Sequence, residues 1–381
     1  MIDPLSFLSE TRRSGIDLFS GVPCSLFTSL IDTVIAQPAA NYIGAANEGD
    51  ALAIACGAEL GGQRAAVLFQ NSGLGNAVNP FTSLAETFRI PALIICSWRG
   101  QPGAAPDEPQ HDRMGKITPA LFELMGIPWE LLPTDEAAIA ATLERAKSHM
   151  DSKHTPYALV VRRGSFTKGA PRTTAPRKPP SLRLDPPAEH SIALDPDLVL
   201  QTIAQGASAT DVLLTTTGFT GRALYAVGDR PNQLYMVGSM GCVSSLGLGL
   251  ARAQPNRRII VLDGDGALLI RMGALATLGY ERPPNLLHIL LDNGVHDSTG
   301  SQATVAPSLD TASIAAACGY PCARRVESLK DLSASVGVPT GELTFVHVPT
   351  QSRTNRKLPR PTITPAEVAQ RLREWIRDHP A

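Results

Sequence analysis

Two polar side chains, Asp265 and Asn293, have the types and the spacing of a site for a hard metal ion. Asp265 lies between two glycines after an apolar run, and Asn293 follows a second apolar run 28 positions later. A strand, a helix and a strand fill that interval, so both side chains are expected beyond the carboxyl ends of neighbouring parallel strands. A carboxylate oxygen and an amide oxygen suit Mg²⁺, which keeps further positions for phosphate oxygens.

The glycines beside Asp265 favour an anionic ligand at the same place. Gly264 and Gly266 allow close approach of the backbone, and a helix expected to start near Ala267 offers free N–H groups to an anion. A diphosphate bridged by Mg²⁺ fits this arrangement. The alternative is a tight turn in which Asp265 caps a helix and Asn293 stabilises a loop, but the spacing and the acid–amide pair favour the metal site. A dinucleotide fingerprint fits less well, because its third glycine is absent.

The elements that must position these side chains are alternating strands and helices. Strands are expected at residues 15–20, 42–45, 65–69, 92–97 and 158–162, and again at 212–215, 234–236, 258–262, 286–291 and 343–348. Helical patterns cover residues 49–60, 135–150, 195–205 and 365–377. This alternation predicts an α/β protein with mainly parallel sheets flanked by helices, since parallel strands need long crossover connections.

A change in composition divides the chain. Residues 168–187 contain six prolines with several Arg and Lys and no apolar periodicity, which predicts an extended linker. A phosphate or RNA patch is the alternative interpretation of these charges, although a solvated linker explains them more simply. We therefore expect one domain at residues 1–167, a linker at 168–190 and a second domain at 191–381.

Composition restricts the class of protein. A formal net charge of −1 argues against a nucleic-acid-binding surface. No apolar run approaches the roughly 18–20 residues of a membrane span, and residues 1–10 do not have the layout of a signal peptide. The six cysteines lack the paired spacing of a zinc site, so buried free thiols are expected. The prediction is a cytoplasmic protein that binds neither nucleic acid nor membrane.

The segment from Gly264 to Asn293 resembles the diphosphate-binding signature of thiamine-diphosphate-dependent 2-oxo acid decarboxylases. The resemblance implies that the side chains of Asp265 and Asn293, with the carbonyl of Val295, ligate Mg²⁺. Residues 46–51 are similar to the family segment whose glutamate contacts the aminopyrimidine ring. Residues 238–241 are similar to the segment that bends the cofactor. Implied cofactor contacts are Glu48, Thr217, Gly218, Gly238, Met240, Gly264, Asp265, Gly266, Ala267 and Asn293.

Glu48 has the catalytic role in this resemblance. A buried carboxylate there shares a proton with the pyrimidine nitrogen and so activates the thiazolium ring, with Met240 as the apolar wedge and the Gly238 carbonyl receiving the 4′-amino group. Taken without the other motifs, Glu48 is better explained as an acid that complements a helix dipole. In the family, the pyrimidine domain of one subunit faces the diphosphate domain of another. The resemblance therefore implies a homodimer or homotetramer with inter-subunit sites and no middle domain.

Residues 21–26, 70–76, 264–273 and 288–302 closely resemble phosphonopyruvate decarboxylases, whose nearest relatives are sulfopyruvate decarboxylases. This implies decarboxylation of 3-phosphonopyruvate to phosphonoacetaldehyde and CO₂, in phosphonate biosynthesis and the antibiotic pathways that use it. The alternatives are a sulfopyruvate or other 2-oxo acid decarboxylase, and a non-catalytic cofactor-binding protein. A dianionic substrate needs guanidinium-type donors. At every candidate position the alternative is an ordinary structural role in a surface loop. The substrate candidates are Ser25, Asn71, Arg99, His111, Asp297 and Ser298, with Arg99 and His111 as the favoured pair.

Overall fold

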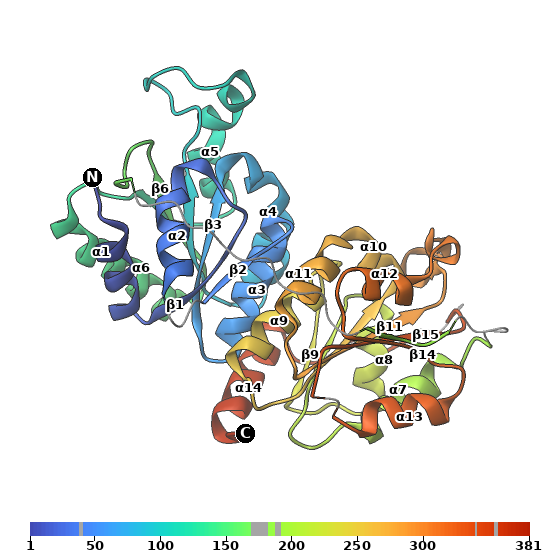
Figure 1. Cartoon of the computed structure of the whole chain (residues 1–381). Helices are drawn as coiled ribbons and strands as arrows, with labels where there is room; N and C mark the ends of the chain where they lie inside the picture. Colours follow the sequence, from blue (N-terminus) through green and yellow to red (C-terminus); the bar gives the residue numbers. More distant parts are fainter. Residues whose placement is uncertain (38–40, 169–181, 187–191, 340, 354–356) are drawn as a thin grey trace. The chain divides into compact units, whose positions relative to one another are not determined.

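The computed structural model describes residues 1–37, 41–168, 182–186, 192–339, 341–353 and 357–381. The chain forms two compact units, Met1–Arg177 and Lys178–Ala381, each built on a parallel sheet (Figure 1). The division falls within the predicted linker, most of which lies outside the described residues. Across the described ranges, no helix has both the length and the apolar character needed to cross a bilayer.

A six-stranded sheet forms the centre of the first unit, in the order β2-β1-β3-β4-β6-β5 with every pairing parallel. Its strands are β1 (Ile16–Gly21), β2 (Tyr42–Gly44), β3 (Arg64–Gln70), β4 (Leu93–Ser97), β5 (Trp129–Leu131) and β6 (Tyr157–Val161). Its helices are α1 (Pro4–Arg13), α2 (Thr28–Ala36), α3 (Glu48–Leu60), α4 (Leu74–Pro80), α5 (Asp112–Leu124) and α6 (Ile139–Lys153). The chain moves outward from β1 to β2 and returns on the other side of β1 as β3. The strand order therefore reverses between β1 and β3, where open α/β sheets bind ligands.

Helices cover both faces of this sheet. Phe7 of α1, Leu30 of α2 and Leu143 of α6 pack with Leu68 and Ile95 in one apolar core. The opposite face is covered by α3, which contacts β1, β3 and α4. Nearly all of α3 is buried, and it is apolar around its circumference, as expected for a helix enclosed on all sides. The core thus fixes the helix that Glu48 begins.

A seven-stranded parallel sheet forms the centre of the second unit, in the order β7-β14-β15-β11-β10-β8-β9. Its strands are β7 (Arg183–Leu184), β8 (Val212–Thr215), β9 (Gln233–Tyr235), β10 (Ile259–Gly264), β11 (Leu286–Asp292), β14 (Cys322–Arg325) and β15 (Thr344–Pro349). A separate antiparallel pair joins β12 (Val295–His296) and β13 (Gln302–Ala303). Here the strand order reverses between β8 and β10.

The helices of the second unit lie in two groups. They are α7 (Pro196–Gly206), α8 (Phe219–Val227), α9 (Val243–Ala253), α10 (Asp265–Ile270), α11 (Gly273–Glu281), α12 (Thr311–Ala317), α13 (Leu329–Gly337) and α14 (Pro365–Asp378). In one group α7 contacts α8 and α13, and in the other α11 contacts α9 and α12 (Figure 1). In the register between β10 and β11, Gly264 lies opposite Leu291. Asp265 and the residues that follow β11 therefore leave the sheet at the same edge.

The predicted fold class is confirmed, and every strand predicted above is present with ends shifted by at most two residues. Among the described residues five strands were missed: β5, β7, β12 and β13 are very short, and β14 carries Arg324 and Arg325, which hide its apolar pattern. The helix predicted to start near Ala267 begins instead at Asp265. The reason is that Gly264 takes the extended N-cap conformation, with φ −119° and ψ 153°.

Candidate active site

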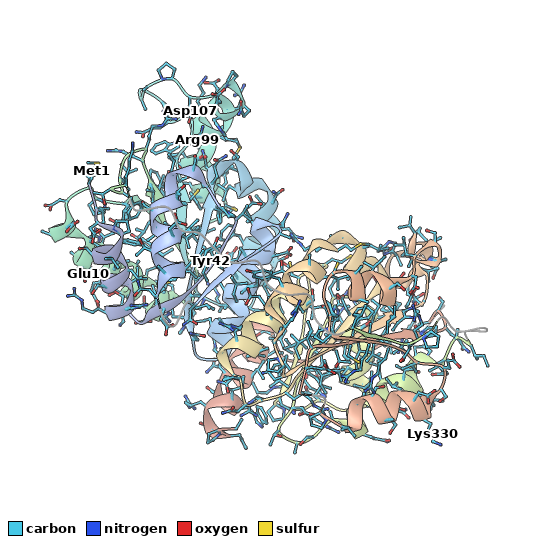
Figure 2. All side chains as sticks on the ribbon, in the orientation of Figure 1. Met1, Glu10, Tyr42, Arg99, Asp107 and Lys330 are labelled. Atoms are coloured by element: carbon cyan, nitrogen blue, oxygen red, sulfur yellow. The ribbon has the colours of Figure 1, made fainter. Side chains whose placement is uncertain are left out.

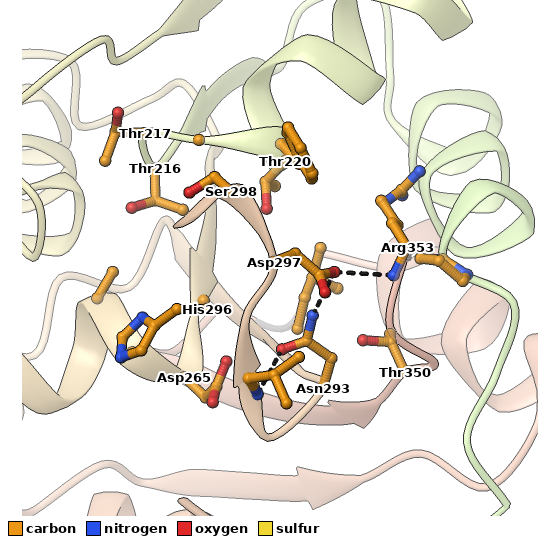
Figure 3. A pocket seen from close by; sticks show the side chains of 18 of the residues that line it. Thr216, Thr217, Thr220, Asp265, Asn293, His296, Asp297, Ser298, Thr350 and Arg353 are labelled. Carbon is orange, nitrogen blue, oxygen red and sulfur yellow. Dashed lines mark hydrogen bonds between the residues drawn. The ribbon is translucent and has the colours of Figure 1, made fainter. Parts of the chain in front are cut away.

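A pocket lies at the carboxyl edge of the second sheet, beyond β8, β10 and β11 (Figure 3). Loops that follow these strands line it together with the loop after β15. Among its lining residues are the predicted cofactor and metal residues Thr217, Gly218, Met240, Gly264, Asp265, Gly266, Ala267, Asn293 and Val295. Gly238 lies in the loop that leads from β9 to Met240. The reversal of strand order thus coincides with the pocket, as expected for an open α/β sheet.

Asp265 is the first residue of α10, directly after β10. Only 4% of the residue is exposed, and its Oδ2 accepts a hydrogen bond from Thr304 Oγ1 at 2.6 Å. Burial raises the pKa of Asp265, and the Asp292 carboxylate raises it further, while the Thr304 hydrogen bond opposes the shift. A buried carboxylate under this penalty is stabilised by a nearby cation.

Asn293 follows β11 and is half-buried. Its amide Nδ2 donates to Asp297 Oδ2 at 2.8 Å, and its Oδ1 accepts the backbone N–H of Val295 at 3.1 Å. The Asp265 carboxylate, the Asn293 amide oxygen and the Val295 carbonyl form an all-oxygen donor set with one formal charge. This set fits Mg²⁺, which binds few protein oxygens and completes its shell with phosphate oxygens and water.

Close packing around Gly266 shapes the pocket. A Cβ on Gly266 would lie 2.4 Å from His296 Cε1 and 3.3 Å from Met240 Cε, so only glycine fits with these side chains in place. Met240 belongs to a turn in which Ser239 has φ 49° and Gly241 has φ 89°. Left-handed backbone is uncommon for a residue other than glycine, and such strain is frequent at ligand sites. The turn holds the Met240 side chain at the pocket.

Sequence reasoning missed three residues of this site. Thr304 binds Asp265, His296 lies against Gly266, and Arg353 lines the pocket from the loop after β15. A signal for Arg353 existed, because every loop that follows a parallel strand reaches the same edge of the sheet. The contacts of Thr304 and His296 depend on the path of a loop, which periodicity does not predict.

Glu48 begins α3, and Asn47 caps that helix by accepting the N–H of Gly49 at 2.8 Å. The Glu48 Oε2 accepts a hydrogen bond from Asn76 Nδ2 at 2.8 Å, and the carboxylate lies against Gly73. The side chain is half-buried within its own unit, and the expected active site includes residues of a second subunit as well. Its catalytic role stays a prediction.

The Arg99 guanidinium makes a bidentate ion pair with Asp107, at 2.7 Å from Nε to Oδ2 and 2.6 Å from Nη2 to Oδ1 (Figure 2). This pair holds the pKa of Asp107 well below its usual range. Arg163 also approaches Asp107, with 3.3 Å between Nη2 and Oδ1. The Arg99 Nη1 reaches Gln70 Oε1 at 3.4 Å, at the carboxyl end of β3. Arg99 is thus already engaged by a carboxylate at this edge of the first sheet.

The other substrate candidates differ in their burial and in the hydrogen bonds that they already make within the chain. Asn71 is buried, donates to the Arg99 carbonyl and to Thr118 Oγ1 at 2.9 Å each, and accepts the Arg99 N–H at 3.0 Å. Its amide therefore ties two loops together. His111 is buried and lies 3.1 Å from Ser72 Oγ through Nδ1, so the favoured candidates Arg99 and His111 contact different partners. Ser25 is exposed, and Asp297 and Ser298 line the pocket of the second unit.

Comparison with known proteins places this geometry in a family. Residues 7–116 match the family described as "Thiamine pyrophosphate enzyme, N-terminal TPP binding domain", and residues 217–348 match "Thiamine pyrophosphate enzyme, C-terminal TPP binding domain". A phosphonopyruvate decarboxylase of Streptomyces viridochromogenes is 40% identical over 100% of this chain and 96% of that protein. A sulfopyruvate decarboxylase of Methanosarcina acetivorans is 33% identical over 96% of this chain and 95% of that protein.

A solved structure agrees on the fold. The benzoylformate decarboxylase of Polynucleobacter necessarius superposes with a TM-score of 0.73 and 14% identity, covering 94% of this chain and 100% of that one. At that identity the likeness establishes architecture alone. The full-length relatives and the two matched domains establish more: the chain belongs to the family of thiamine-diphosphate-dependent 2-oxo acid decarboxylases, in the group that contains phosphonopyruvate and sulfopyruvate decarboxylases.

Proposed function

We propose that this enzyme decarboxylates 3-phosphonopyruvate to phosphonoacetaldehyde and CO₂, using thiamine diphosphate and Mg²⁺, as a step of phosphonate biosynthesis. The observation that supports this choice of substrate is the 40% identity over the whole chain to a protein named phosphonopyruvate decarboxylase. A second protein of that name, from Streptomyces hygroscopicus, is 39% identical over 98% of the chain. Loss of CO₂ makes the step effectively irreversible.

Sulfopyruvate is the second candidate substrate, and the Methanosarcina relative supports it. The presence of both domains in one chain does not separate the two substrates, because the sulfopyruvate relative also matches the chain across both units. Phosphonopyruvate stays first on the strength of the higher identity.

The residues at the edge of the second sheet would hold the cofactor through its metal ion. Asp265, Asn293 and the Val295 carbonyl would ligate Mg²⁺, and the backbone beside Gly266 would lie against the diphosphate. When bound, thiamine diphosphate supplies the electron sink that loss of CO₂ requires. The chain would supply orientation: Met240 lines the pocket and would be the apolar contact that shapes the bound cofactor.

Glu48 would hold a proton at the pyrimidine nitrogen. Asn76 fixes one of its oxygens through the 2.8 Å hydrogen bond, which leaves the other to share that proton. Glu48→Gln preserves the shape of the side chain but not its ability to exchange a proton, so it should keep cofactor binding and lose at least about 100-fold in kcat. Undiminished turnover in Glu48→Gln, measured as CO₂ release, would remove this assignment.

Recognition of the substrate's second acidic group would come from the first unit. Arg99 and Arg163 converge on the single Asp107 carboxylate at the carboxyl edge of the sheet. The Arg163 side chain is 58% exposed, so its N–H groups can reach a further anion. Guanidinium groups bind phosphonate and sulfonate oxygens through paired hydrogen bonds. This grouping supports a strongly acidic substrate over pyruvate.

The assembly would be a homodimer or homotetramer whose active sites are shared between subunits. Glu48 belongs to the first unit and the metal ligands to the second. Mixing inactive Glu48→Gln with inactive Asp265→Asn tests the arrangement, because a mixed pair of subunits would contain one site with both residues intact. Random exchange should restore about a quarter of wild-type activity. No recovery after demonstrated subunit exchange would contradict shared sites.

Parallel steady-state assays of phosphonopyruvate, sulfopyruvate and pyruvate decide the substrate. We expect the highest kcat/KM for phosphonopyruvate and the lowest for pyruvate, since pyruvate lacks the second anionic group. A higher kcat/KM for sulfopyruvate would overturn the first choice.

A further inference from the structure

Asp297 joins two loops at the edge of the second sheet (Figure 3). Its Oδ2 accepts the Asn293 Nδ2 at 2.8 Å and the backbone N–H of Arg353 at 2.8 Å. Its Oδ1 accepts Ser352 Oγ at 2.5 Å and Ser301 Oγ at 3.4 Å. Four donors thus converge on one half-buried carboxylate, two from the loop after β11 and two from the loop after β15.

This arrangement determines which way the Asn293 amide points. An ionised carboxylate only accepts hydrogen bonds, so it selects the N–H₂ end of a neighbouring amide. The Asn293 Oδ1 then lies at the opposite end, where it accepts the Val295 N–H at 3.1 Å. Both contacts require the same orientation of the amide. The oxygen, which is the end that a hard cation binds, is thereby fixed.

The second loop is itself anchored, so Asp297 is held from both sides. The Arg353 side chain is buried, and its guanidinium forms an ion pair with Asp197 in the first turn of α7. Its own backbone N–H is the group that reaches Asp297. The Asp197 side chain is half-buried, so separating this ion pair would leave the buried Arg353 guanidinium without its partner charge, and the pair resists displacement.

We propose that Asp297 is a positioning residue for the metal site. It orients Asn293 so that Oδ1 faces the divalent cation, and it acts through Asn293 rather than on the substrate. This inference rests on the proposed role of Asn293 as a Mg²⁺ ligand. Groups that orient the ligands of a metal ion commonly change its affinity by 10- to 100-fold when they are replaced.

Asp297→Asn is the informative variant because it keeps the size of the side chain. It replaces a carboxylate, which only accepts hydrogen bonds, by an amide, which can also donate them. An amide at position 297 can donate to Asn293 Oδ1 as readily as it accepts from Nδ2, so only the Val295 N–H would still select the orientation of the Asn293 amide. Titration of Mg²⁺ into the metal-free full-length protein with saturating thiamine diphosphate, followed by calorimetry, should show affinity weakened by about 10- to 100-fold. Asp378→Asn, the same chemical change at an exposed site, is the matched control and should bind Mg²⁺ like the wild type.

A double-variant cycle separates positioning from a general structural effect. If Asp297 acts through Asn293, Asp297→Asn should add little to the loss of Mg²⁺ affinity already caused by Asn293→Ala. Losses that simply add would overturn the inference, as would a raised KM for the substrate with unchanged Mg²⁺ affinity. If circular dichroism shows that Asp297→Asn does not fold, the cycle is repeated with Asp297→Ser, whose hydroxyl can donate as well as accept hydrogen bonds. Asp297→Ser should again add little to the loss of Mg²⁺ affinity caused by Asn293→Ala.

The wild-type titration distinguishes failure of the proposed metal site from failure of the positioning role of Asp297. Binding of thiamine diphosphate without any Mg²⁺ dependence would remove the proposed metal site itself. Mg²⁺-dependent binding in the wild type, with equal Mg²⁺ affinity in Asp297→Asn, would leave the proposed function standing and refute the positioning role alone.

Discussion

A methyl group added at Gly73 would strike the Glu48 carboxylate and so tests its role without changing its chemistry. A Cβ on Gly73 would lie 1.9 Å from Glu48 Oε1, 2.1 Å from Cδ and 2.6 Å from Cγ. Gly73 has φ −86° and ψ −3°, which alanine adopts without strain. Gly73→Ala should therefore leave the backbone in place and displace the flexible Glu48 side chain.

The distances give the size of the effect. Real Cβ atoms stay about 3.0 Å or more from such neighbours, so Oε1 must move by at least 1.1 Å from its 1.9 Å position. Misplacing a catalytic group by about 1 Å costs on the order of 100-fold in rate. Replacing Gly by Ala where the backbone tolerates it stabilises a fold by about 0.4–1 kcal/mol through the unfolded chain. That gain offsets part of the cost of moving the half-buried Glu48 side chain, so the melting temperature should stay close to that of the wild type.

The assay compares kcat at saturating thiamine diphosphate and Mg²⁺ with the thermal midpoint from circular dichroism. Gly75→Ala is the matched control, because a Cβ on Gly75, two residues further along the same segment, meets no atom within 4 Å. Gly75→Ala should keep wild-type kcat, whereas Gly73→Ala should lose it and keep its cofactor. Wild-type kcat in Gly73→Ala would refute the reasoning that assigns the proton to a precisely placed Glu48.

Three further predictions follow from the charged groups. Asp265→Asn should abolish Mg²⁺-dependent cofactor binding while the metal-free protein melts at the same or a higher temperature, because burial raises the pKa of Asp265 and its ionised form destabilises the fold at neutral pH. Asp107→Asn should lower stability by at most about 3 kcal/mol at pH 7. Since Arg99 depresses the pKa of Asp107, that contribution is present above the unfolded pKa of about 4, and melts at decreasing pH should show the difference from wild type shrinking below it. Arg99→Ala should raise KM for phosphonopyruvate far more than for pyruvate, and an equal rise for both in steady-state assays would clear Arg99 of anion recognition.

The spacing of Asp265 and Asn293 predicted that both residues leave the second sheet at the same edge, because that spacing follows from the order of its strands. Asp265 and Asn293 each end an apolar strand, and one crossover helix places those strands side by side, as the register of β10 and β11 confirms. The local strand–helix–strand pattern was therefore enough to predict that β10 and β11 pair. The same reasoning could have extended to the loop after β15, whose strand pairs directly with β11.

Other contacts depend on tertiary structure and left no local signal. Arg353 pairs with Asp197 across 156 positions, and Thr304 reaches Asp265 across 39. Arg353 and Thr304 lie in loops, whose paths depend on turn geometry rather than on the periodicity of apolar residues. The burial of Glu48 likewise has no local signal, because a sequence pattern identifies the residue but its exposure depends on everything that packs around it.

The charges that line the pocket of the second unit support a further prediction, that the proposed metal ion and cofactor bind together. Among the lining residues that the structure describes, Asp265 and Asp297 are acidic, and the cationic Arg353 is already paired with Asp197. A diphosphate entering such a pocket alone would meet like charges with little compensation. A divalent cation held by the Asp265 carboxylate would reverse that balance. Because the cation is the shared partner, its affinity should rise with thiamine diphosphate concentration by the same factor as cofactor affinity rises with Mg²⁺.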